Sequence, residues 1–100
     1  MSTLRGMAEI FKEHKNFIHF LLLKIMRIHV NSGFLFLDKK QLQFAKIQFE
    51  DTLKFAKKNK LNECYFEGEL KEDYDDIIDS CKFNIQRIKA QILMDEQKIT

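Results

Sequence analysis

The chain has 100 residues, a formal net charge of +2 and a hydrophobic content of 45%. This length corresponds to one small domain, and ordinary hydrophobicity with little net charge excludes a disordered chain. There is no proline and there are only three glycines, so we expect few, long and uninterrupted elements.

The first predicted element is a helix over residues 3–30. Its apolar residues recur at alternating spacings of three and four, the period of a helical stripe that packs against a core. This main seam consists of Leu4, Met7, Phe11, His14, Ile18, Leu21, Ile25 and Ile28. The sequence Asn-Ser-Gly at 31–33 is expected to end the helix in a turn.

The same region holds the most apolar stretch of the chain, residues 14–30. A membrane-spanning helix needs roughly 20 mostly apolar residues. The uncharged run lasts only from Asn16 to Leu23, between Lys15 and Lys24. We therefore expect a helix that does not span a membrane. The N-terminus also lacks the pattern of a secretory signal, so a cytoplasmic or otherwise intracellular location is expected.

Two further helices are predicted at approximately 38–60 and 70–97. Asp38 and Gln41 match a capping box that would start the second helix, after a connector at 34–37. The buried stripe of the second helix is expected at Leu42, Ala45, Phe49, Leu53 and Ala56. That of the third is expected at Leu70, Tyr74, Ile77, Ile78, Cys81, Ile85, Ile88 and Ile92. Residues 61–69 could extend the second helix or form a connector. The sequence thus predicts an all-α fold, a single domain over 1–100 that forms a small antiparallel three-helix bundle with long helices.

The first and third helices carry more apolar surface than two neighbouring helices can cover. The surplus residues are Leu22, Leu23, Met26 and Val30 on the first helix, and Phe83, Ala90 and Met94 on the third. Either the connectors cover them, or they are buried against another chain. The second alternative predicts a non-enzymatic protein–protein interaction module. It would be an adaptor, inhibitor, regulator or assembly subunit that binds another protein or forms a homo-oligomer.

Charge is distributed unevenly along the chain. The first sixty residues contain twelve Lys or Arg and five acids, and the last forty contain five and ten. A basic cluster, Lys54, Lys57, Lys58 and Lys60, closes the second helix and could contact nucleic acid, which makes a nucleic-acid-binding accessory protein the alternative function. The acidic residues that follow would repel phosphate, and the basic cluster would also complement the end of its helix. Nucleic acid is therefore the weaker prediction.

Few residues offer catalytic chemistry. His14, His19 and His29 are five and ten residues apart, which does not place two metal ligands on one helical face. Cys81 falls on an apolar stripe, and Cys64 lies among acids that disfavour a thiolate. No catalytic residue, metal site or cofactor is predicted. A third alternative is a homodimer that responds to redox state through the cysteines or to pH through His14.

Overall fold

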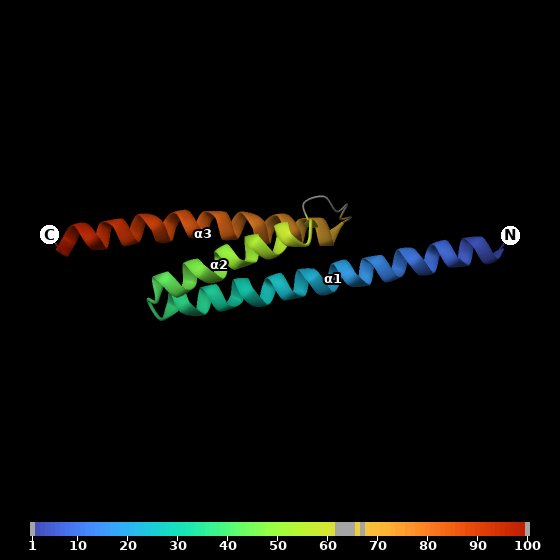
Figure 1. Ribbon diagram of the computed structural model, residues 1–100, viewed down its shortest axis with the longest axis horizontal. Helices are drawn as coiled ribbons and strands as arrows, with labels where there is room; N and C mark the ends of the chain where they lie inside the picture. The colour runs from blue at the N-terminus through green and yellow to red at the C-terminus, as the bar shows by residue number, and fades with distance from the viewer. Residues whose placement is uncertain (1, 62–65, 67, 100) are drawn as a thin grey trace.

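The computed structural model describes the backbone of residues 2–61, 66 and 68–99, and the side chains of residues 13–15, 17–61, 66 and 68–98. Three helices, α1 (Ser2–Asp38), α2 (Leu42–Lys58) and α3 (Glu69–Ile99), form an all-α bundle, which confirms the predicted fold class. α2 runs antiparallel to both neighbours, and α1 and α3 are offset so that each extends past the bundle at an opposite end (Figure 1). The molecule is a rod of 74 × 21 × 21 Å.

α1 continues through the expected turn at 31–33 and the expected connector at 34–37. Gly33 is the reason that this stretch resembled a turn, but its role is a close approach between helices. A Cβ atom at Gly33 would lie 2.8 Å from the ring of Phe49 on α2, too near for an unstrained contact. The absent side chain therefore lets α2 pack directly against α1.

α1 ends instead in a left-handed cap. Lys40 has φ 59°, its N–H donates to the Leu37 carbonyl at 2.9 Å, and the N–H of Gln41 donates to the Phe36 carbonyl at 2.9 Å. These two bonds make a Schellman motif, which satisfies carbonyls at a helix end. The capping box predicted at Asp38 does not form, because Asp38 belongs to α1 and Gln41 precedes α2 without a side-chain cap.

The stripes predicted for α2 and α3 are confirmed as the core. The buried members are Ala45, Phe49 and Ala56 on α2 and Ile77, Cys81, Ile85 and Ile88 on α3. Two connector residues, Leu61 and Phe66, are buried with them, and the Phe66 ring stacks on Tyr74 with 4.9 Å between centroids. Residues 62–65 and 67 of the ambiguous segment lie outside the described residues.

Every fully buried side-chain nitrogen or oxygen atom in the described part of the chain has a hydrogen-bond partner. The Thr52 hydroxyl donates to the Gln48 carbonyl at 2.8 Å, and the Asn84 amide donates to the Ser80 carbonyl at 2.7 Å. Both bonds stay within one helix. The contacts of the core itself are mainly apolar and depend on the shapes of the side chains.

Candidate functional site

The side of α1 that packs on α2 and α3 is a narrow stripe at spacings of four and three. We call it the inner stripe, and it consists of His19, Leu23, Met26, Val30 and Gly33. Met26 and Val30 are completely buried. Leu23, Met26 and Val30, which were predicted to meet a partner, therefore lie in the core of one chain, and Leu22 is half-buried beside them.

The residues of α1 that were expected in the core are instead on the surface. His14, Ile18, Leu21, Ile25 and Ile28 are the described members of the predicted seam, and all are exposed, with Ile28 at 64%. We call Ile18, Leu21, Ile25 and Ile28, together with the exposed Leu35 from the expected connector, the outer seam. The sequence-based assignment of the two faces is thus wrong. Both faces have helical spacing, so periodicity alone does not decide which one is buried. Interpreting Gly33 as a turn also hid its place on the inner stripe.

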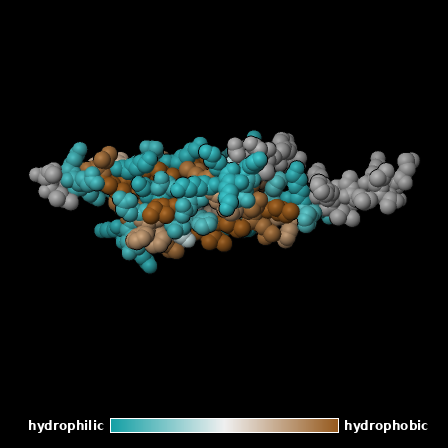
Figure 2. Space-filling model, viewed as in Figure 1, coloured by the Kyte–Doolittle hydropathy of each residue, from teal (hydrophilic) through white to brown (hydrophobic). Residues whose placement is uncertain are grey.

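Aromatic side chains widen the apolar surface around the outer seam. Phe17 and Phe20 are exposed beside it. At the other end of the seam, the ring centroids of Phe36 and Phe44 are 5.6 Å apart. Phe44 is exposed, so the apolar surface continues onto α2. Figure 2 shows hydrophobic side chains along the edge of the rod that α1 occupies in Figure 1. Exposed apolar surfaces of this kind are typical of sites that contact a protein partner, a membrane or a ligand.

The charges bordering this surface are positive. Between residues 14 and 37 the sequence has three cationic side chains, Lys15, Lys24 and Arg27, and no acidic one. The Arg27 guanidinium reaches towards Asp76 and Asp73 on α3, at 3.8 and 4.0 Å. Pairs this exposed contribute little stability, but they direct the charge of α1 towards α3 and away from the outer seam.

The residues predicted on α3 are placed differently. Phe83, Ala90 and Met94 are all exposed, with Phe83 at 67%. Their expected companions on α1 are mostly in the core, so the structure does not join the two sets into one surface. The α3 set is a sparse second patch with Leu93 beside it.

The basic cluster lies at the end of α2 with every side chain exposed: Lys54, Lys57, Lys58 and Lys60. Lys57 and Lys58 occupy the last turn of the helix, where cations stabilise the negative end of the dipole. α3 begins after the connector with Glu69 and Glu72 in its first turn. A phosphate bound by the lysines would thus approach acidic residues that follow closely in the chain.

The described cysteine is not placed to bridge two copies. Cys81 is a free, fully buried thiol. Burial raises the pKa of the Cys81 thiol to about 11, and a side-chain hydrogen bond with Thr52 offsets part of that shift. A protonated, buried thiol is a poor nucleophile. Cys64 lies outside the described residues.

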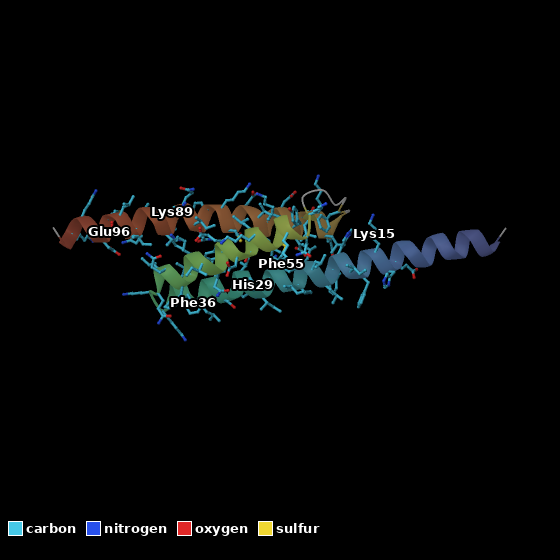
Figure 3. All side chains as sticks on the ribbon, viewed as in Figure 1. Lys15, His29, Phe36, Phe55, Lys89 and Glu96 are labelled. Atoms are coloured by element: carbon cyan, nitrogen blue, oxygen red, sulfur yellow. The ribbon has the colours of Figure 1, made fainter. Side chains whose placement is uncertain are left out.

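The three histidines have separate environments. His14 is exposed on the side of the outer seam. His19 is buried, and its ring meets Phe66 edge-on with 5.1 Å between centroids. His29 lies between α1 and α2 (Figure 3), with Nδ1 3.5 Å from Oε1 of Gln48 and its ring 6.4 Å from Phe55. Among the described residues, no three His, Cys, Asp or Glu side chains gather as metal ligands do.

A pocket of about 330 Å³ opens where the end of α1 meets α2 and α3. Its walls combine apolar side chains, such as Phe34 and Leu42, with polar ones, such as Asn84 and Arg87. It adjoins the core on the α3 side of α1, away from the outer seam. Nothing in its lining selects a particular ligand.

α1 also meets the length and composition of a membrane-crossing helix over Glu13–Asp38. The expectation of no span treated Lys24 as the end of the apolar run. Lys24 and Arg27 are the only charged residues between 16 and 37, but both lie near the middle of this stretch, where a charge in a spanning helix is most costly. That α1 does not span a membrane stays a prediction.

Comparisons with protein-family models, curated proteins and solved structures find no match to this chain.

Proposed function

We propose that this chain is a non-enzymatic protein–protein interaction module that binds through the outer seam of α1. The observation that carries the proposal is the exposure of five large aliphatic side chains in helical register over residues 18–35. A helix presented in this way docks by burying its apolar face against another protein surface. Adaptors, inhibitors, regulators and assembly subunits all act in this way.

The total exposed surface supports the proposal. A compact 12.0 kDa protein exposes about 6,000 Å², whereas this chain exposes 7920 Å². The difference, about 1,900 Å², exceeds the roughly 800 Å² that one partner contributes to a standard interface. The chain therefore has ample surface to give to a partner and still expose as much as a compact monomer does.

Site-specific photo-crosslinking in the native cell tests this function. A photoreactive amino acid at Ile28 or Leu21 should give discrete protein adducts, because both side chains point out of the bundle. The matched control is the same amino acid at Lys71 or Lys82, exposed polar positions on α3. Adducts of equal yield at all four positions, or none at the outer seam, would contradict the proposal.

Nucleic-acid binding is a second candidate, and the exposure of Lys54, Lys57 and Lys58 on one end of α2 is the observation in its favour. Fluorescence anisotropy with labelled DNA and RNA at low salt tests it. Binding that weakens steeply with salt, and that is lost when these three lysines become Gln, would support this function. Absence of binding at low salt would remove it.

A further inference from the structure

We propose that the partner of the outer seam is a second copy of this chain, paired helix to helix through α1. This inference rests on the proposed function and names its partner. In such a dimer, the same surface of each copy contacts that of the other, as in most symmetric dimers.

The spacing of the outer seam calls for a helical partner. Ile18, Leu21, Ile25 and Ile28 follow spacings of three and four, and Leu35 lies one heptad beyond Ile28. Ser32 occupies the intervening seam position, and its hydroxyl donates to the Ile28 carbonyl of the same helix. An average period of 3.5 residues lets two helices wind around each other along such a seam. In the sequence the same spacing runs back through His14, Phe11 and Met7 to Leu4. A seam of more than four heptads meets the length typical of coiled coils.

The inner stripe behaves differently along the same helix. Stepping back from His19 by three and four residues reaches Asn16, Lys12 and Glu9. The apolar character of the inner face thus stops close to where Figure 1 shows α1 leaving the bundle, whereas that of the outer seam continues. The outer seam is therefore longer than the core of one chain requires, and its length suits a partner that runs along more of α1.

The geometry allows an identical helix to approach. At 100° per residue, the outer seam is centred about 150° around α1 from the inner stripe. α2 and α3 pack on the inner stripe, so two copies facing each other through the outer seam carry their remaining helices on the outside. Over the whole chain, the exposed surface exceeds that of a compact protein by about 1,900 Å², which is of the same order as the roughly 1,000–2,500 Å² per chain that obligate homodimers bury.

Charge does not oppose self-pairing. Between residues 14 and 37, the charged side chains nearest the seam are Lys15 and Lys24, and helical geometry puts them on opposite rims. A lipid surface is a poorer partner. The basic residues that attract anionic headgroups are partly neutralised at the side of α1, because α3 carries Asp73 and Asp76 against Arg27.

Absolute mass from light scattering over a concentration series of the purified full-length chain tests the inference. Wild type should have twice the 12.0 kDa of one chain. Ile28→Glu should dissociate the dimer and keep the helical circular dichroism. Because symmetry places that substitution in the interface twice, we expect the dissociation constant to rise at least about 100-fold.

Leu21→Gln is a milder variant in case the first does not fold. Phe83→Glu, on α3 at nearly the same exposure as Ile28, should leave the dimer intact.

A wild-type mass of 12.0 kDa at every concentration would overturn the inference, as would a dimer that survives both seam variants. Co-sedimentation of a monomeric chain with vesicles of phosphatidylcholine and phosphatidylglycerol, lost in Ile28→Glu, would also overturn it in favour of lipid. The two proposals fail separately. A monomer that still photo-crosslinks at Ile28 to a different protein refutes self-pairing and keeps the interaction function.

Discussion

His19 is the one buried histidine of the described residues, and its imidazole lies among apolar groups of the core. Burial, and secondarily the charge of Lys15, lower the pKa of His19 from its ordinary 6.5. The unfolded chain therefore binds a proton at a higher pH than the folded chain does. We predict that the free energy of unfolding falls as the pH drops from about 7.5 to 5.5, and levels off once the folded histidine is also protonated.

Urea denaturation at a series of pH values measures this dependence. In His19→Leu the slope through this window should be reduced, since His14 and His29 are in more accessible positions. An unchanged slope in His19→Leu would show that another group controls the acid sensitivity.

Gly33 determines how closely α1 and α2 pack. Alanine in a helix is ordinarily favoured over glycine by about 1 kcal/mol, but a Cβ atom here meets the Phe49 ring at 2.8 Å. Phe49 is fully buried, so its ring has little room to move. We predict that Gly33→Ala lowers the free energy of unfolding by about 1–3 kcal/mol, measured by thermal or urea denaturation. Phe49→Leu should recover part of the loss in the Gly33→Ala background.

Lys40 closes α1 in a conformation that suits glycine better. A left-handed residue with a side chain is strained by roughly 1 kcal/mol, and φ at Lys40 is 59°. We predict that Lys40→Gly raises the free energy of unfolding by up to about 1 kcal/mol, whereas Lys40→Val lowers it. Equal stabilities in the three proteins would mean that the cap does not form in solution.

The sequence predicts α2 and α3 well because each has one dominant apolar stripe. Residues such as Phe49 and Ile77 then belong to the core without ambiguity. α1 has two stripes of similar strength, and which of them is buried depends on contacts with residues distant in sequence, such as that of Gly33 with Phe49. The end of α1 was predicted too early for the same reason. A glycine in a helical pattern indicates either a turn or a close contact, and only the partner helix distinguishes the two.

At the scale of the whole molecule, two leucines distinguish the buried face of α1 from its exposed face. Leu23 is 4% exposed and Leu21 is 44% exposed, although they are two residues apart. We predict that Leu23→Asp unfolds the bundle, because an unpaired charge in the core costs several kcal/mol. Leu21→Asp should change the stability of a single chain by about 1 kcal/mol or less. Circular dichroism melts at low protein concentration distinguish the two. Equal loss of structure in both variants would show that both faces of α1 hold the fold together.

The offset of α1 and α3 gives the chain an unusual hydrodynamic character. Its radius of gyration is 18.1 Å, a value that a compact protein reaches at about 250 residues. A single copy sweeps out the volume of a globule more than twice its mass, so it should tumble slowly and elute early from a sizing column. The elution volume will thus depend first on the elongated shape of the chain and only then on the number of copies in the assembly.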